Sequence, residues 1–281
     1  MQHVGKTALV VEGGAMRGIF SCGVLDHFME VDFSPFDSFW GVSAGASNLA
    51  AYIAKMPKRN KKIYLDYSLR KEFVSLPRFM LGGDMIHLDW MWEITLKELG
   101  IDKQTFDQDP RPFFLAVTNS KTGKAEYHTP TSEELAEIMK ASSAIPILYR
   151  PGVSLGSGHY VDGGVADSIP IAEAIKRGAT RIMVIRSREK LYRKKKAKIS
   201  ALFPYLLKQT PALAGPMATR HEGYNLSVDL INQPPKGVEI IEICPPSGFS
   251  LGRLARSHQE LEKAYQFGVE AGKEAIRRWE T

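Results

Sequence analysis

Short apolar runs alternate with segments of helical periodicity along most of the chain. The first apolar run, residues 7–11, ends at a glycine cluster, and apolar residues then recur at helical spacing over 18–29. The same order returns with a run at 39–42, a turn at 41–45 and an alanine-rich segment at 46–54. Two successive strand–turn–helix units predict a parallel sheet, because parallel strands need a crossover connection that is usually helical.

The alternation continues through the rest of the chain. Strands are predicted at 113–117, within 153–161, at 181–185 and at 238–243, and helices at 133–140 and 171–177. No internal repeat and no low-complexity linker marks a boundary between domains. The expected fold class is therefore α/β, a single domain with a mainly parallel central sheet, helices on both faces and right-handed crossovers.

Three segments follow this alternation less closely. Residues 63–99 are rich in Met and Trp, and residues 199–217 are apolar but interrupted by three prolines, so both are expected to form helical or irregular insertions. Residues 254–279 are charged and amphipathic, which predicts a terminal helix that docks on the domain. Four residues are expected to line its apolar face: Leu254, Leu261, Tyr265 and Val269.

Composition places the chain among globular proteins. Of its 281 residues 44% are hydrophobic and 24% charged, which excludes a disordered or collagen-like chain. The formal net charge is +6, but the run 188–198, from Arg188 to Lys198, alone holds seven cations and one anion. Because the remainder is close to neutral, a uniformly basic nucleic-acid surface is not expected. The run itself is interpreted either as a solvated, mobile segment or as a peripheral contact with an anionic membrane.

Cysteine content and hydropathy favour a cytoplasmic location. Cys22 and Cys244 are too few and too far apart to predict a disulfide framework or a cysteine-rich metal site. No stretch of about 18 uncharged apolar residues occurs, so no membrane-spanning helix is predicted. Residues 1–6 do not have the basic start of a secretory signal.

The segment Gly41-Val42-Ser43-Ala44-Gly45 fits the G-x-S-x-G motif of serine hydrolases. In that motif a sharp strand-to-helix turn exposes the serine oxygen, and the glycines relieve crowding around it. The match lies where the hydrophobic pattern independently predicts a strand-to-helix junction. Ser43 is therefore a candidate nucleophile, although a small residue packed in a tight turn is the plainer interpretation.

A second motif, Glu12-Gly13-Gly14-Ala15-Met16-Arg17-Gly18, lies in the preceding strand-to-helix turn. Its backbone amides, close to a helix N-terminus, would attract negative charge. Because both turns follow parallel strands, they are expected to meet at the carboxyl edge of the sheet, where such sheets bind ligands. The loop could then stabilise the oxyanion of an acyl transfer, a contribution of about 2.7 to 4 kcal/mol per donor.

A third motif is Asp162-Gly163-Gly164, at the end of a short apolar run. An aspartate there could accept the serine proton directly. Because a carboxylate with a pKa of about 3.9 is a weak base for a hydroxyl, such a dyad depends on burial and on a strong oxyanion hole. The plainer interpretation of Asp162 is an Asx-turn before the glycines.

In this order, the three motifs resemble those of the patatin-like phospholipases, in particular the bacterial members. Two further segments support the resemblance: Ala141-Ser142-Ser143-Ala144-Ile145-Pro146, and the predicted terminal helix with its Leu254, Leu261 and Tyr265 spacing. The resemblance covers nearly the whole chain and implies one patatin-like domain over residues 6–275. It also implies a hydrolase that cleaves carboxylic esters of lipids, most readily phospholipids or lysophospholipids, without a cofactor.

The resemblance also implies roles for individual residues. Ser43 would be the nucleophile, Asp162 the general base, and the Gly13, Gly14 and Ala15 amides the oxyanion hole. Arg17 would orient a phosphate or polarise the carbonyl. The remaining motif glycines would support the turns: Gly18, Gly41, Gly45, Gly163 and Gly164. Ala15 stands where the family usually has a third glycine, so at positive φ it is expected to be strained by about 1 kcal/mol.

Two other functions remain open from the residues alone. A Ser-His-Asp esterase would need a histidine beside Ser43, and His159, His221 and His258 are the candidates. A non-catalytic lipid- or nucleotide-binding module would keep the glycine loop without turnover. The G-x-G-x-x-G fingerprint of nucleotide binding fails at Ala15, and only Asp32 or Asp37 could supply its acidic residue.

No metal site is predicted. The sequence has no H-E-x-x-H or calcium-loop pattern, and Asp102, Asp107 and Asp109 are interpreted as residues of a turn before Pro110. The Met and Trp residues between Met80 and Trp92 are interpreted as core or helix cap, although an acyl pocket would need a similar apolar lining.

Overall fold

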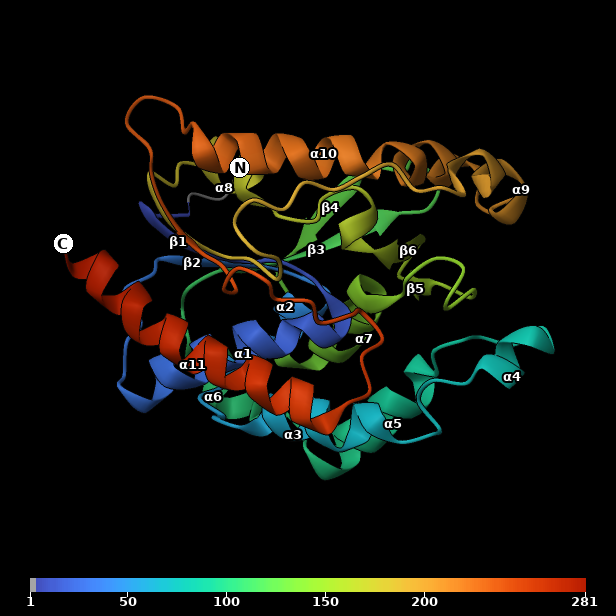
Figure 1. Ribbon diagram of the computed structural model, residues 1–281, viewed down its shortest axis with the longest axis horizontal. Helices are drawn as coiled ribbons and strands as arrows, with labels where there is room; N and C mark the ends of the chain where they lie inside the picture. The colour runs from blue at the N-terminus through green and yellow to red at the C-terminus, as the bar shows by residue number, and fades with distance from the viewer. Residues whose placement is uncertain (1–3) are drawn as a thin grey trace.

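The computed structural model describes residues 4–281, so the first three of the residues 1–6 considered above lie outside it. A sheet of eight strands runs through the centre of the molecule (Figure 1). The strands are β1 (Thr7–Val11), β2 (Ser38–Val42), β3 (Phe113–Asn119), β4 (Ala125–His128), β5 (Val153–Leu155), β6 (Gly158–Asp162), β7 (Arg181–Ile185) and β8 (Glu239–Ile243).

The sheet is mainly parallel, as predicted. Strands β3, β2, β1, β7 and β8 pair in this order and all run parallel. At one end β3 also pairs antiparallel with β4 and β6, and β5 and β6 form a hairpin within the region 153–161. Strand β4 was not predicted, because its sequence, Ala-Glu-Tyr-His, contains no apolar run.

Helices cover both faces of the sheet, which confirms the predicted architecture. The α-helices are α1 (Ile19–Glu30), α2 (Ala44–Ile53), α3 (Arg59–Leu65), α4 (Leu76–Met80), α5 (Leu88–Glu98), α6 (Lys103–Gln108), α7 (Ser132–Ser143), α8 (Ile171–Lys176), α9 (Phe203–Leu206), α10 (Ala214–Asn232) and α11 (His258–Glu280). Figure 1 shows α8 and α10 on one side of the sheet and α1, α2, α3 and α11 on the other. Of the helices within residues 4–281, none is long and apolar enough to cross a bilayer.

Alternate residues of the central strands enter two different cores. On β1, Leu9 and Val11 pack with α1, α2 and α11, whereas Ala8 and Val10 pack with α8 and α10. All four side chains are fully buried. A strand covered on both faces consists of apolar residues without alternation, which explains the continuous apolar run at 7–11.

Helices α1 and α11 approach each other closely at two glycines. A Cβ at Gly268 would overlap the Phe20 carbonyl oxygen, and one at Gly23 would overlap the Tyr265 carbonyl oxygen. Leu261 and Tyr265 face this contact and are buried, as predicted. The predicted place of Leu254 on the same face is wrong: α11 begins only at His258, capped by Ser257, and Leu254 is 40% exposed in the preceding loop.

Replacing Gly268 with alanine tests this contact. The added methyl group would push α11 away from α1, so we expect Gly268→Ala to lower the free energy of unfolding by about 1 to 3 kcal/mol or more. Gly223→Ala on α10 is the matched control, because nothing lies within 4 Å of its Cβ position. There alanine should raise stability by about 0.5 to 1 kcal/mol. Urea unfolding of both variants measures the difference, and equal shifts would contradict the close approach.

Candidate functional site

Strand β3 brings the ends of β2 and β6 together. Val42 of β2 pairs with Ala116, and Asp162 of β6 pairs with the next residue, Val117. Because β4 occupies the opposite edge of β3 at these positions, β2 and β6 share one edge. Ser43, which follows β2 directly, therefore lies beside Asp162 although 119 residues separate them in sequence.

Ser43 occupies a sharp turn between β2 and α2. Its backbone has φ 53° and ψ −124°, a conformation that L-residues rarely adopt. The neighbouring chain leaves no room for side chains at the motif glycines: a Cβ at Gly45 would overlap the Val11 carbonyl oxygen, and one at Gly41 would lie 2.6 Å from the Ala46 Cα. Such a strained turn is typical of a site where the structure holds a side chain in a fixed direction.

The segment 141–146 holds both residues in place. The Ser43 N–H donates to Ser142 Oγ (2.8 Å), which in turn donates to the Ala116 carbonyl (2.6 Å). The Asp162 N–H donates to the Ala144 carbonyl (2.9 Å). In the sequence this segment supports the family resemblance, but no motif marks Ser142 as the residue that fixes the turn.

The glycine loop lies against the Ser43 turn. A Cβ at Gly13 would be 2.8 Å from the Val42 carbonyl oxygen and 3.1 Å from the Ser43 Cβ. Within residues 4–281, the N–H groups of Gly13, Gly14 and Ala15 donate to no acceptor, so they are available to a bound anion. Ala15 has φ 49°, a left-handed conformation that strains an alanine.

Asp162 is 4% exposed, and its two carboxylate oxygens have different surroundings. Oδ1 accepts a hydrogen bond from the Gly164 N–H (2.7 Å), which is the Asx-turn anticipated above. Oδ2 accepts no hydrogen bond from residues 4–281. In the same part of the chain no hydrogen bond joins Asp162 to Ser43 Oγ, but both line one cavity. Catalytic hydrogen bonds commonly tighten only when substrate binds.

Ser43 lies where two cavities of opposite character meet. The larger, about 1020 Å³ including the space open to solvent, is lined mainly by apolar side chains of α3, α5 and the loops around α4, among them Ile63, Met91 and Trp92. The smaller, about 330 Å³, is lined by the glycine loop and Asp162. An amphiphilic molecule that spans both cavities would have its apolar part on one side of Ser43 and its polar part on the other.

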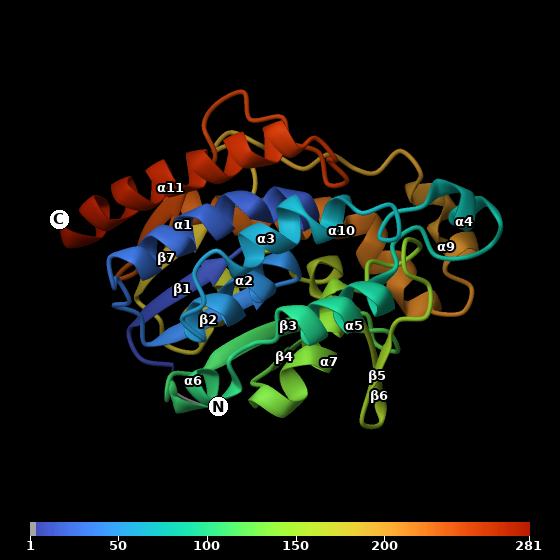
Figure 2. The ribbon, with the colours of Figure 1, turned by 90° about the horizontal axis from the view of Figure 1, so that it is seen from below.

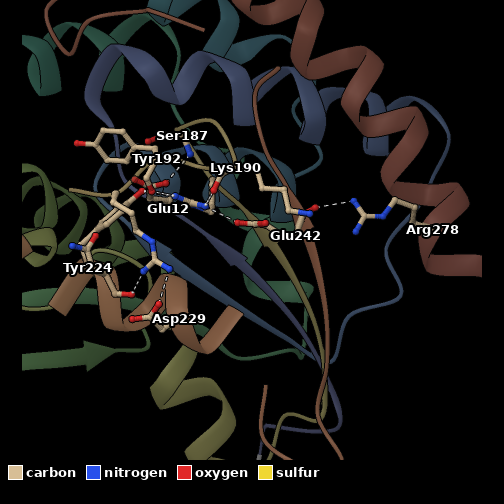
Figure 3. A network of polar contacts seen from close by, with 11 residues as sticks. Glu12, Ser187, Lys190, Tyr192, Tyr224, Asp229, Glu242 and Arg278 are labelled. Carbon is tan, nitrogen blue, oxygen red and sulfur yellow. Dashed lines mark hydrogen bonds and ion pairs between the residues drawn. The ribbon is translucent and has the colours of Figure 1, made fainter. Parts of the chain in front are cut away.

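Arg17 does not line either cavity. Its side chain is 2% exposed, and Nη2 donates to Ser187 Oγ at 3.4 Å. Burial lowers the pKa of its guanidinium to about 10. Ser187 also donates its N–H to Glu12 (2.7 Å), and Figure 3 shows these two residues joined beside Tyr192 and Tyr224. The geometry gives no support to direct contact between Arg17 and a carbonyl at Ser43.

Three further cations surround the smaller cavity, and sequence analysis did not identify them as site residues. Arg220 of α10 and Arg253 of the loop before α11 line it. Lys194, from the basic run, does not line it but lies close enough to interact with both arginines, and its Nζ is 4.4 Å from the centre of the Tyr224 ring. Burial and the nearby charges of Arg220 and Arg253 lower the pKa of Lys194 to about 6. No local motif marks these residues, which come from three distant segments.

The candidate histidines of a catalytic triad lie elsewhere. The His159 ring is hydrogen-bonded to Ser120 Oγ (2.8 Å) and to the Pro151 carbonyl (2.7 Å). His221 bonds the Ala218 carbonyl of its own helix (3.1 Å). No histidine of residues 4–281 lines a cavity that contains Ser43.

No metal centre is found in the described part of the chain, where no group of three His, Cys, Asp or Glu side chains could hold an ion. Asp102 caps α6, and its carboxylate accepts a hydrogen bond from the Thr105 N–H (3.0 Å). The turn expected before Pro110 is therefore preceded by a short helix.

Comparison with protein families gives two matches. The family model for patatin-like phospholipase matches residues 9–175, which include Ser43 and Asp162. A domain of unknown function, DUF6363, matches residues 210–281.

Similar proteins and structures extend these matches. The uncharacterized protein YjjU of Escherichia coli (strain K12) is 35% identical over 283 residues, covering 96% of this chain and 76% of that protein. The probable lipid hydrolase 463L of Invertebrate iridescent virus 6 is 25% identical over 186 residues, covering 60% of this chain and 63% of that protein. The crystal structure of VipD from Legionella pneumophila aligns with a TM-score of 0.46 and 14% identity, over 99% of this chain and 67% of that chain.

The backbone strain at Ser43 can be measured by comparing two variants. Ser43→Ala and Ser43→Gly both remove the hydroxyl, but only glycine adopts φ 53° without strain. We expect Ser43→Gly to be more stable than Ser43→Ala by about 1 to 3 kcal/mol in chemical unfolding. The same pair at Ser47, inside α2, should show the opposite order, with glycine less stable by about 1 kcal/mol. The same order at both positions would argue against strain at Ser43.

Proposed function

Because the chain belongs to the patatin-like phospholipase family, which implies lipid ester hydrolysis, we propose that Ser43 and Asp162 form the catalytic dyad of a serine acyl hydrolase. The proposed substrates are carboxylic esters of lipids, most readily phospholipids or lysophospholipids. The observation that carries this proposal is the position of Ser43 between an apolar cavity and a polar one that also contains Asp162.

In the first half of the reaction, Ser43 Oγ attacks the ester carbonyl of the bound lipid. Asp162 Oδ2, which is free of other hydrogen bonds from residues 4–281, accepts the serine proton. The tetrahedral intermediate carries an oxyanion, and the unpartnered N–H groups of Gly13, Gly14 and Ala15 stabilise it. When the intermediate collapses, the alcohol leaves with the proton from Asp162, and the acyl group stays on Ser43.

In the second half, water replaces the departed alcohol in the smaller cavity. Asp162 accepts a proton from this water, the resulting hydroxide attacks the acyl-serine, and the same amides stabilise the second oxyanion. Collapse releases the fatty acid and returns the proton to Ser43. The reaction uses only groups that the chain supplies, so we propose that it needs no cofactor.

The larger cavity suits the acyl chain. Its wall is mostly apolar and includes Met91 and Trp92 from the Met- and Trp-rich region, so these residues belong both to the fold and to the proposed acyl pocket. Burial of each CH₂ group contributes about 0.8 kcal/mol, enough to orient a chain of several carbons.

We also propose that residues 6–275 act as one domain. Strand β8 completes the parallel sheet beside β7, and α11 covers α1 through the glycine contact described above. These elements lie beyond the part that matches the patatin-like phospholipase family model, residues 9–175. They bury apolar surface of that part, which favours a single unit.

Substitution of the dyad tests the proposed chemistry. Ser43→Ala removes the nucleophile, and Asp162→Asn removes the carboxylate that accepts and returns protons. Each variant should therefore lower the rate of ester hydrolysis about a thousandfold or more. Initial rates on a chromogenic short-chain ester and on phospholipid vesicles measure the loss. His159→Ala serves as the control, because its ring is bonded to Ser120 and Pro151 rather than to Ser43.

Other outcomes would point to a different function. An equal loss in His159→Ala or His221→Ala would favour a Ser-His-Asp esterase. Failure of an activated phosphonate to label Ser43, together with no turnover on any ester, would favour a non-catalytic binding module.

We further propose that one end of the molecule contacts an anionic membrane. Helices α4 and α9 both lie at this end (Figures 1 and 2). Both carry exposed apolar side chains, with Met80 71% and Tyr205 69% exposed. The run 188–198 precedes α9, and the residues that flank α4, Phe73 and Ile86, line the proposed acyl pocket. A membrane at this end would lie next to the cavity that takes the lipid chain.

Removing three exposed cations tests this contact. Each basic residue near an anionic surface contributes about 1 kcal/mol, so Lys195, Lys196 and Lys198 together changed to Gln should weaken binding up to about a hundredfold at low salt. Cosedimentation with anionic vesicles measures binding, and added salt should reduce the difference. The control changes Lys55, Lys62 and Lys236 to Gln, three lysines that are also exposed. Equal binding by both triple variants would contradict a specific contact through the run.

A further inference from the structure

The smaller cavity has an excess of positive charge that the proposed reaction does not use. Four cations lie in or around it: Arg17, Lys194, Arg220 and Arg253. Two carboxylates face them, Glu12 and Asp162. None of the four cations forms an ion pair within 4 Å with a carboxylate of residues 4–281. The cavity therefore holds uncompensated positive charge beside the candidate nucleophile.

Several buried nitrogen atoms of this cluster have no partner. Arg17 Nε and Nη1 and Arg220 Nε are buried and donate to no acceptor in the described residues. Burial and the charge of Arg253 lower the pKa of Arg220 to about 10. Because an unpartnered buried donor is costly, a site with several of them is arranged for an acceptor that arrives with a ligand.

The Arg220 guanidinium is directed at the catalytic end of the cavity. Its Nη2 would lie 2.7 Å from a Cβ on Gly164, and Asp162 Oδ1 would lie 2.9 Å from the same point. The absence of a side chain at Gly164 thus gives Arg220 access to the space beside Asp162. Arg253 is exposed and lines both cavities.

The lining also restricts the kind of polar group that fits. It contains no aromatic side chain, and its only carboxylate is Asp162. Cationic headgroups such as choline are recognised by aromatic faces or by carboxylates. A headgroup that ends in a phosphate offers several acceptor oxygens and up to two negative charges, which suits two guanidinium groups.

On the basis of the proposed function, we propose that the smaller cavity binds the phosphate monoester headgroup of the lipid substrate, with Arg220 and Arg253 in contact with the phosphate. Arg17 adds positive potential from outside the lining, and Lys194 adds it when it is protonated. The preferred substrate class is therefore an acyl ester of glycerol phosphate rather than a zwitterionic or neutral lipid. The acyl chain and the phosphate would bind on opposite sides of Ser43, with the ester bond at Ser43 itself.

Matched substrates with a short acyl chain test this preference without a membrane. The set is hexanoyl-glycerol phosphate, hexanoyl-glycerol phosphocholine and hexanoyl-glycerol, and kcat/KM is measured for each. A hydrogen-bonded charge is worth about 1.5 to 3 kcal/mol, so the phosphate monoester should exceed the neutral ester by about 10- to 100-fold. Equal kcat/KM for the three substrates would overturn the proposal.

Two variants connect the preference to the cavity. Arg220→Gln and Arg253→Gln should each reduce the ratio of kcat/KM for phosphate over neutral ester by about tenfold or more, and Arg253→Lys should restore part of it. A merely structural defect would lower both rates together and leave the ratio unchanged, which would contradict the assignment. Arg253 is exposed, so its variants are expected to fold. Lys236→Gln removes an exposed cation elsewhere and should not change the ratio.

Direct binding separates this proposal from the proposed function. Calorimetry with Ser43→Ala protein measures the affinity for glycerol 3-phosphate, inorganic phosphate and glycerol, and needs no turnover. Binding of glycerol phosphate without hydrolysis of any ester would support the phosphate site and overturn the acyl hydrolase. Ester hydrolysis without phosphate binding and without a headgroup preference would support the acyl hydrolase and overturn the phosphate site. Inorganic phosphate could inhibit hydrolysis although kcat/KM is no higher for the phosphate ester than for the neutral ester. That result would indicate a site for free phosphate and overturn the headgroup assignment.

Lys194 gives a second readout of the same binding. The charged or titratable groups that face it are Glu12, Arg17, Arg220, Tyr224 and Arg253. With its pKa lowered to about 6, Lys194 is mostly neutral above pH 7, and a nearby phosphate dianion would raise that pKa again. Binding at pH 7.5 should then take up protons, at most one per site, measured as a dependence of binding heat on the buffer. Uptake that persists in Lys194→Gln would contradict this role.

Discussion

The shared edge of β3 is the constraint on which the candidate site depends. Strands β2 and β6 pair with consecutive residues of this edge, Ala116 and Val117, so Ser43 and Asp162 meet there. A slip of one residue in β6 would turn the Asp162 side chain to the other face of the sheet. The buried core prevents it, because residues 114–117 of β3 are fully buried. The Thr118 hydroxyl also donates to the Asp162 carbonyl (2.9 Å). The geometry of the site is in this sense a consequence of core packing.

The same rigid sheet holds two strained residues side by side. Ser43 and Ala15 both have positive φ, and each follows a strand whose last four residues are buried. Together such conformations cost a few kcal/mol, and the two cores on either face of β1 offset this cost. Ser142 adds a fixed hydrogen bond to the Ser43 amide, so relaxation of the turn would also break contact with β3. Strain here keeps the Ser43 side chain directed at the cavities.

The features that could be predicted from the sequence are those in which the interacting residues are close together along the chain. The two strand–turn–helix units and the turn at Ser43 depend on local patterns, and the structure has all of them. Strand β4 was missed because it is partly exposed and pairs only with β3. The contact of Ser142 with Ser43 spans 99 residues, and no periodicity encodes it. The direction of the Arg17 side chain likewise depends on Ser187, a residue on a distant strand end.

Two parts of the chain contribute differently to the two sides of Ser43. The proposed dyad and the glycine loop lie in residues 9–175, where the family model matches. The cations of the smaller cavity, Lys194, Arg220 and Arg253, come from the segments that follow. Because those side chains come from the run 188–198, from α10 and from the loop before α11, they can differ without any change in the β3 register. Residues 9–175 thus fix the positions of the reacting groups, whereas the later segments set the positive charge near the substrate headgroup. A headgroup preference can therefore arise without disturbing the geometry of the dyad.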